Sequence, residues 1–271
     1  MNPNDALQTP VTTVIENRIM TITIQREPQL NALNQAVIEA ISESLFHHLQ
    51  STHFDDPEGV RVVVLQGAGN RAFAAGADIA EMASISPQEA QRISALGQSL
   101  TKTLESLPQV VIAKVRGYAL GGGLELAMAC DIIVGAQSAK FGMPEVNLGL
   151  IPGFGGTQRL VRRVGLPIAL DMILSGKSRT LNAHEAWNLG LISRVVADDQ
   201  LDSEVESIIR GLLLAGPGAQ AAAKRLIRRS YDMNLEAGLD CESQAFALCF
   251  SGGEAEEGIA AFLEKAPSPF A

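Results

Sequence analysis

Aromatic residues, cysteines and histidines are all scarce in this sequence of 271 residues. Aromatics make up 4% although hydrophobic residues reach 46%, so the core must be built from Ala, Val, Ile and Leu. The three cysteines are odd in number and lack zinc-site spacing, which indicates free thiols in a reducing compartment. Three of the four histidines lie at the end of one predicted surface helix and form no metal set with the cysteines. The sequence therefore predicts no metal site.

Positive charge and long apolar runs are lacking as well. The net charge of −9 argues against a surface for nucleic acid or anionic membranes, although a local basic cluster could still hold a small anion. No apolar run approaches 18 residues without a charge, Gly or Pro, so we expect no membrane span. The first residues, MNPNDALQTP, have none of the features of a targeting segment, which favours a cytoplasmic protein.

The stretch Val110–Asp131, VVIAKVRGYALGGGLELAMACD, predicts a buried strand, a glycine-rich turn and a short apolar helix. Glycines at a strand-to-helix junction let the backbone approach a ligand. The first amides of the helix are unpaired and carry the positive end of its dipole, so they suit an oxygen that becomes an anion. Glu125 adds a titratable group beside them. Taken alone, a flexible turn and a solvated carboxylate explain these residues equally well.

Two further segments allow a similar interpretation. FAAGADI, at 73–79, is built of small residues that would let a backbone amide point into a site, although a tight turn explains it as well. Glu145 follows a proline in the apolar, glycine-rich segment FGMPEVNLGLIPGFGG, where a carboxyl group would have a raised pKa. An ordinary surface glutamate is the commoner case. Two such acids beside an anion site suit proton transfer around a carbonyl.

Strands alternate with helices up to residue 196, which predicts an α/β fold. We expect a hairpin over 11–24, a helix capped by Asn34, a turn at 55–59 and a helix opening at Ser86. The segment 144–156 is expected to be a long loop or a broken turn.

The last part of the sequence has a different character. It shows no convincing strand, and helices are predicted over 202–214, after 216–218, over 235–250 and over 254–265. We therefore divide the chain into a core, residues 1–200, that carries the site and a helical region, residues 201–271. The apolar faces of that region exceed what a lone helical tail should expose, so we interpret it as an association surface.

Three segments together resemble the signatures of the crotonase family, and specifically of enoyl-CoA hydratases. They are FAAGADI, GYALGGGLELAMACDI and KFGMPEVNLGLIPGFGGTQRL, and the resemblance covers nearly the whole chain. It implies a spiral of ββα units followed by a C-terminal helical region that builds homotrimers, commonly paired into homohexamers.

The resemblance also assigns residues. It implies an oxyanion hole at the amides of Ala77 and Gly122 and catalytic acids at Glu125 and Glu145, with Glu125 as the base toward water. The substrate and CoA contacts that it implies include the two oxyanion-hole residues and fall on Ala75, Ala77, Ile79, Gly122, Gly153, Phe262 and Lys265. The last two are expected to reach the site of a neighbouring subunit. The chain departs from the family pattern at Arg26-Glu27-Pro28 and Ala80, which face the nucleotide end of CoA, and at Met143, beside the acyl pocket.

The implied activity is hydration of a trans-2-enoyl-CoA to a 3-hydroxyacyl-CoA, in fatty acid β-oxidation or branched acyl-CoA metabolism. It needs no metal or redox cofactor, because coenzyme A is part of the substrate. A Δ3-Δ2 enoyl-CoA isomerase is the first alternative, although such an enzyme can work with only the second acid and the presence of Glu125 favours hydration. A CoA-binding assembly protein without catalysis is the second.

Overall fold

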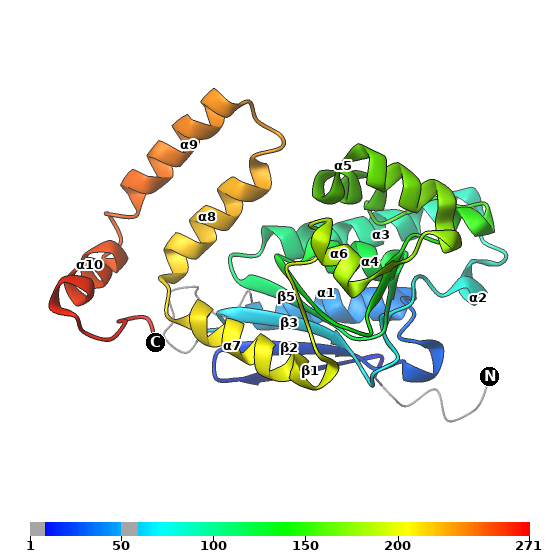
Figure 1. Cartoon of the computed structure of the whole chain (residues 1–271), viewed down its shortest axis with the longest axis horizontal. Coiled ribbons are helices and arrows are strands. Elements are labelled where there is room, and N and C mark those ends of the chain that lie inside the picture. The colour runs from blue at the N-terminus through cyan, green and yellow to red at the C-terminus, as the bar shows by residue number, and fades with distance from the viewer. Residues whose placement is uncertain (1–8, 50–58) are drawn as a thin grey trace.

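The computed structural model describes residues 9–49 and 59–271, which form two sheets with helices around them (Figure 1). A six-stranded sheet has the order β1-β2-β3-β5-β7-β10, and a four-stranded sheet has the order β4-β6-β8-β9. Among the strands in the described part of the chain, only the pairs β1–β2 and β8–β9 are antiparallel. The strands are β1 (Val11–Glu16), β2 (Ile19–Ile24), β3 (Val62–Gly67), β4 (Ala72–Ala74), β5 (Val110–Val115), β6 (Tyr118–Leu120), β7 (Ile132–Ala136), β8 (Lys140–Gly142), β9 (Leu181–Asn182) and β10 (Arg194–Val196).

Successive strands alternate between the two sheets. β3, β5 and β7 belong to the large sheet, and the strands that follow them, β4, β6 and β8, belong to the small one. A helix closes each of these strand pairs, so the chain winds as a spiral of ββα units, and the predicted α/β spiral is confirmed. The helices are α1 (Gln35–Leu49), α2 (Ile79–Met82), α3 (Pro87–Ser106), α4 (Gly122–Ala129), α5 (Gly156–Ser175), α6 (Ala183–Asn188), α7 (Leu201–Leu213), α8 (Pro217–Arg229), α9 (Leu235–Leu248) and α10 (Glu254–Glu264).

The core lies on both faces of the large sheet and is almost wholly aliphatic. Successive residues of β3 and β5 face opposite sides of the sheet, as the period of a strand requires. Val63 and Val111 pack with α1, α3 and α4, whereas Val62 and Ile112 pack with α7 on the other face (Figure 1). Burial on both faces explains why these parallel strands read as continuous apolar runs rather than alternating ones.

Local signals place most element ends correctly. Asn17 and Arg18 have positive φ in the β1–β2 turn, and the side chain of Asn34 accepts a hydrogen bond from the amide of Val37. Ser86 caps α3, which has Pro87 at its first turn. The segment expected to be a long loop or a broken turn contains a 3-10 helix, Glu145–Leu148, which ends at Gly149 in the left-handed conformation. Most of the predicted turn at 55–59 lies outside the described residues.

The C-terminal helices differ sharply among themselves. α7 buries Leu201, Val205, Ile208 and Ile209 against the large sheet, whereas α8, α9 and α10 contain no buried residue and project away from it (Figure 1). The division at residue 200 stays a prediction, but in packing terms α7 belongs with the core. Within the described part of the chain, no helix is both long and apolar enough to span a bilayer.

Candidate active site

Three parallel strands of the small sheet end at one edge, and each is followed by a predicted site residue. β4, β6 and β8 are neighbours in that sheet. Ala77 follows β4, Gly122 and Glu125 follow β6, and Glu145 follows β8. Ligands bind at this carboxyl edge in open parallel sheets. Here it opens into a cavity of about 1830 Å³, which these four residues line.

The amides of Ala77 and Gly122 lie close to each other. A Cβ built on Gly122 would stand 3.6 Å from the nitrogen of Ala77. Gly122 is the first residue of α4, so its amide has no partner within the helix. Among the described residues, no hydrogen-bond acceptor is found for either amide. Two neighbouring amides, of which one begins a helix, can together stabilise one developing negative charge.

Glycine is required in this turn for two separate reasons. Gly121 has a φ of +48°, and a Cβ on it would lie 2.6 Å from Oε1 of Glu145. A Cβ on Gly123 would lie 2.0 Å from the carbonyl oxygen of Ala74, at the end of β4. The triple glycine is therefore a packing requirement that brings β4, α4 and Glu145 together, and a merely flexible turn does not explain it.

Glu125 is fully enclosed, with 1% of its surface exposed. Its Oε1 accepts hydrogen bonds from the amides of Phe154, at 2.8 Å, and Gly156, at 2.5 Å. Burial raises the pKa of Glu125 to about 7, and the charge of Glu145 adds to that rise, while the two amides and Arg159 oppose it. A carboxyl group with such a pKa exchanges protons readily near neutral pH.

Glu145 is held less tightly. It is the first residue of the 3-10 helix after β8 and is partly buried, and burial raises the pKa of its carboxyl group. Its Oε2 is enclosed yet has no hydrogen-bond partner among the described residues. An enclosed carboxyl oxygen without a partner is costly unless a ligand or water meets it. Glu125 and Glu145 thus line one cavity but differ in hydrogen bonding. Oε1 of Glu125 accepts two hydrogen bonds, whereas Oε2 of Glu145 has no partner among the described residues.

The other residues that the sequence predicts at the site divide into two groups. Ala75, Ile79 and Gly153 line the same cavity. The carbonyl oxygen of Gly153 accepts hydrogen bonds from Ser94, at 2.6 Å, and Gln98, at 3.1 Å, both on α3. The loop before α5 is therefore anchored to α3 as well as to Glu125.

Phe262 and Lys265 are not brought to this cavity. Phe262 is 82% exposed on α10, and Lys265 caps the end of that helix in the left-handed conformation. In Figure 1, α10 lies at the opposite end of the molecule from α2. Their predicted contact with CoA would thus have to be made in a neighbouring subunit.

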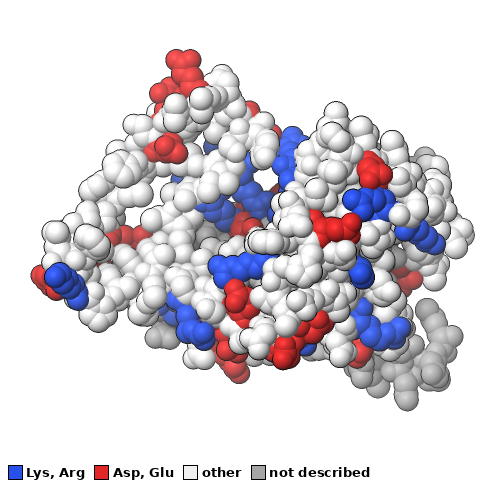
Figure 2. All heavy atoms as spheres, viewed as in Figure 1, with Lys and Arg blue, Asp and Glu red and all other residues white. Residues whose placement is uncertain are grey.

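Basic side chains gather in the hollow between α5 and α8, where the cavity continues (Figure 2). Most of them have partners. Arg159 pairs with Glu105, and Arg228 and Lys224 both pair with Asp131. This cluster braces the helices around the cavity, even though the whole chain carries a net charge of −9.

Sequence reasoning missed Phe154, Gly156 and Arg159. All three lie in the glycine-rich segment PGFGGTQR. Every residue except proline has a backbone amide, so the residue types do not indicate which amides bind Glu125. Met143, expected beside the acyl pocket, is fully buried and is not among the residues that line the cavity. Arg26, one of the departures from the family pattern, pairs with Asp78 at 2.9 Å beside Ala77. Within residues 9–49 and 59–271, no group of three or more potential metal ligands is found.

Known proteins resemble this chain over nearly its full length. The crotonyl-CoA hydratase of Syntrophomonas wolfei is 38% identical over 255 residues, which cover 94% of this chain and 95% of that protein. The short-chain-enoyl-CoA hydratase of Clostridium acetobutylicum is 37% identical over 250 residues, which cover 92% of this chain and 93% of that protein.

Solved structures agree. An enoyl-CoA hydratase from Bacillus anthracis has a TM-score of 0.89 and 34% identity, covering 96% of this chain and 98% of that one. The family described as enoyl-CoA hydratase/isomerase matches residues 14–271. With three strand ends that converge on one cavity and relatives of this similarity, the chain belongs to the enoyl-CoA hydratase/isomerase family.

Proposed function

We propose that this protein adds water across the C2–C3 double bond of a trans-2-enoyl-CoA and gives the 3-hydroxyacyl-CoA. The observation that carries the proposal is that Glu125 and Glu145 line one cavity together with Ala77 and Gly122, whose amides lie close to each other. The names of the relatives, which are hydratases of crotonyl-CoA and short-chain enoyl-CoA, support the same reaction.

The two carboxyl groups divide the chemistry of water. Glu125, held by two amides, takes a proton from the water as the oxygen of that water bonds to C3. The electron pair of the double bond moves to C2, which then receives a proton from Glu145. The enclosed Oε2 of Glu145 meets the water or the substrate, which supplies its missing partner. The product has gained one molecule of water, and a proton returns from Glu125 to Glu145 before the next turnover.

The thioester oxygen gains negative charge while C2 is electron-rich. We place this oxygen between the amides of Ala77 and Gly122. Removing one such donor typically lowers kcat by about 10²–10³-fold. Hydration neither oxidises nor reduces the substrate, so the proposed steps use only these groups of the chain.

We propose that the preferred substrate carries a short acyl chain, because the names of the two relatives specify short substrates. The test is a panel of trans-2-enoyl-CoA thioesters from C4 to C16, with branched members, followed by the loss of the enoyl-thioester absorbance. The highest kcat/KM is expected at the short end. An optimum among the long or branched thioesters would contradict the chain length and leave the reaction standing.

The same assay separates the alternatives. A Δ3-Δ2 isomerase would convert a 3-enoyl-CoA to the 2-enoyl form without adding water. A binding protein would retain the thioester without turnover. Product analysis by mass, where hydration adds the mass of one water molecule, decides among the three. Failure to hydrate any enoyl-CoA would overturn the proposal.

We further propose that the chain forms a homotrimer or a pair of trimers through the helices after α7. The supporting observation is the exposure of large apolar side chains there, including Leu235 at 78%, Phe246 at 68% and Phe262 at 82%. Large apolar surfaces left exposed in one region are uncommon on monomeric proteins and often mark association sites. Light scattering coupled to size exclusion gives the mass directly, and a fully active monomer would contradict the shared site.

A further inference from the structure

The position of Glu125 depends on the backbone just before α5. Both hydrogen bonds to its Oε1 come from that segment, from the amides of Phe154 and Gly156. Gly155, between them, has a φ of +104°, a conformation that glycine adopts without strain. Hydrogen bonds to a charged group are stronger than hydrogen bonds between neutral groups. A shift of this segment would therefore weaken the two bonds that stabilise the charged form of Glu125.

Arg159 holds that segment from the first turn of α5. Its Nη1 donates to the carbonyl oxygen of Phe154 at 2.8 Å. Its Nε and Nη2 donate to the two carboxylate oxygens of Glu105, on α3, at 2.7 Å each. Such a two-bonded pair fixes both distance and orientation, which a lysine cannot do. Only 15% and 25% of the two side chains are exposed, so solvent competes less than at an ordinary surface ion pair.

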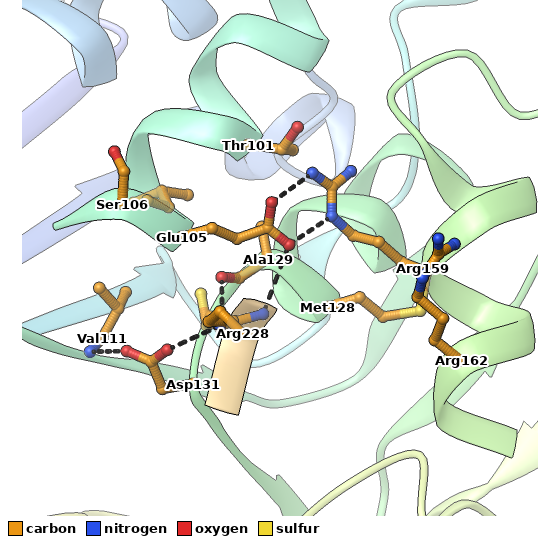
Figure 3. A network of polar contacts seen from close by, with 12 residues as sticks. Thr101, Glu105, Ser106, Val111, Met128, Ala129, Asp131, Arg159, Arg162 and Arg228 are labelled. Atoms are coloured by element: carbon orange, nitrogen blue, oxygen red, sulfur yellow. Dashed lines mark hydrogen bonds and ion pairs between the residues drawn. The ribbon is translucent and has the colours of Figure 1, made fainter. Parts of the chain in front are cut away.

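Glu105 is shared with the C-terminal helices. Arg228, on α8, donates to Glu105 at 3.3 Å, to Asp131 at 2.8 Å and to the carbonyl oxygen of Ala129 at 2.9 Å. Figure 3 shows Glu105 between Arg159 and Arg228, with Asp131 on the far side of Arg228. An unbroken series of contacts therefore leads from α8 through Glu105, Arg159 and Phe154 to Glu125.

We propose that Arg159 and Glu105 are positioning residues for Glu125, and that Arg228 completes the arrangement from α8. Neither arginine touches the reacting atoms in this proposal. Arg159 keeps the carbonyl of Phe154 turned toward itself, so the amides of Phe154 and Gly156 stay directed at the carboxylate. Arg228 holds Glu105 in place, which makes the geometry at Glu125 depend on the docking of α8. The inference rests on the proposed hydration.

The central test compares Arg159→Gln, Arg159→Lys and Glu105→Gln with the wild type on crotonyl-CoA. We expect Arg159→Gln to lower kcat by about 10- to 100-fold with KM changed less than about threefold, because small misplacements of a reacting group cost rates of this size. The low-pH limb of the kcat profile should move to higher pH, since a positive charge near Glu125 is lost. Glu145 and Arg159 are the charged groups that face it.

The conservative variant separates charge from geometry. Arg159→Lys keeps the positive charge but loses the planar guanidinium that binds both oxygens of Glu105. The low-pH limb of the kcat profile should therefore return toward its wild-type position, while kcat stays low. Glu105→Gln should lower kcat in the same direction, and the double variant with Arg159→Gln should be far from multiplicative. Arg228→Gln should lower kcat by about three- to tenfold, by the same loss of positioning, and lose that effect in the Glu105→Gln background.

Arg194→Gln is the matched control, because Arg194 also pairs with a glutamate, Glu204, at 2.5 Å but lies away from the cavity. It should leave kcat and the pH profile unchanged. Thermal unfolding of every variant is measured alongside. If Arg159→Gln fails to fold, Glu105→Gln and Arg228→Gln carry the test.

The outcomes are distinct. A wild type that leaves crotonyl-CoA and all other enoyl-CoA substrates unchanged overturns the proposed function and the inference with it. An active wild type whose Arg159 and Glu105 variants keep both kcat and pH profile overturns the inference alone. Variants that lose thermal stability yet keep wild-type kcat and pH profile would assign the network to structure only, which also overturns it.

Discussion

Helices α4 and α10 are both short, and both carry residues that the sequence predicts at the site, yet their surroundings are opposite. Every residue of α4 is buried, including Glu125, whereas α10 has no buried residue and exposes Phe262. α4 packs against α3, α5 and the strands β4 and β6 of the small sheet. α10 lies at the outer end of the C-terminal helices (Figure 1).

The difference separates two kinds of site residue. Reacting groups need fixed geometry, and α4 provides it within one chain through packing and the amides of Phe154 and Gly156. A contact with the distant end of a long substrate can be supplied by another copy. Variants on α4 should therefore act on kcat, and variants on α10 should act on KM and depend on assembly.

The largest effect is expected from removing a reacting carboxylate. Glu125→Gln and Glu145→Gln should each lower kcat by about 10²–10⁴-fold, the range for general acid–base groups, with little change in thioester binding. The double variant should lose far less than the product of the two, because the acids act as a unit. Steady-state kinetics and isothermal titration with a non-reacting acyl-CoA measure both quantities.

Glu256→Gln on α10 is the control for the same chemical change at an exposed carboxylate. It should keep wild-type kcat. Near-wild-type turnover in either Glu125→Gln or Glu145→Gln would remove that residue from the mechanism and erase the contrast between the helices.

Much of this arrangement could be predicted from the sequence. The apolar, β-branched runs mark the strands, and glycines 121–123 mark a close approach of backbone to backbone. Capping residues such as Asn34 and Ser86 place helix starts, because their side chains bond to amides three residues on. These signals are local, so one sequence suffices to read them.

Other features could not be predicted, because they depend on contacts between distant segments. Arg159 and Glu105 are 54 positions apart, and nothing in either neighbourhood indicates their pairing. The amides that hold Glu125 are backbone groups, which every residue has. α7 was grouped with the exposed helices by its sequence, since only the tertiary structure shows that its apolar face covers the second face of the large sheet.

The next effect tests the amide of Gly122. A Cβ there would lie 3.2 Å from the ring of Phe154, which is tighter than ordinary contact. Gly122→Val should therefore displace Phe154 and the amide together and lower kcat by about 10²–10³-fold, the cost of losing an oxyanion donor. Stopped-flow or steady-state turnover measures it, with circular dichroism to verify folding.

Gly211→Ala, on α7, is the matched control, because a Cβ there meets no heavy atom within 4 Å. It should leave turnover unchanged. A folded Gly122→Val enzyme with full activity would place the stabilising donors elsewhere.

A third prediction concerns stability. Burial holds the pKa of Glu125 at about 7 in the folded chain, above its ordinary value of 4.5, so the folded state binds the proton more tightly than the unfolded state. Stability is then greatest below the ordinary pKa and falls as pH rises toward 7. Glu125→Gln removes the ionisation, so at pH 8 it should be more stable than the wild type by about 3 kcal/mol.

The measurement is urea unfolding of both proteins between pH 4 and pH 8. The gap should close toward the acid end, where the wild-type carboxyl is protonated. Glu256→Gln, exposed on α10, should differ from the wild type by less than about 0.5 kcal/mol at every pH. A wild type that is as stable as Glu125→Gln at pH 8 would mean that the carboxylate is better solvated than its 1% exposure implies.

The smallest effect is expected at the far end of α10. Lys265 is exposed there, and CoA carries several negative charges into a chain whose net charge is −9. Lys265→Glu should raise KM for enoyl-CoA by about three- to tenfold at low salt, as expected for reversing one solvent-exposed charge, and leave kcat nearly unchanged. The difference should shrink as salt rises, because exposed charges are screened. Lys140→Glu, an exposed lysine on β8 away from the cavity, is the control.

Mixing subunits then decides whether Lys265 acts within its own chain. Lys265→Glu subunits keep their reacting acids, and Glu125→Gln subunits keep their lysine. If α10 completes a neighbour's site, mixed assemblies should contain Lys265→Glu active sites served by an intact lysine, and a fraction of the activity should recover the wild-type KM. If the two proteins are refolded together and the mixture keeps the raised KM of Lys265→Glu, Lys265 acts within its own chain or only through the electrostatic potential of the whole assembly. In that case α10 and α4 would not divide binding and chemistry between subunits.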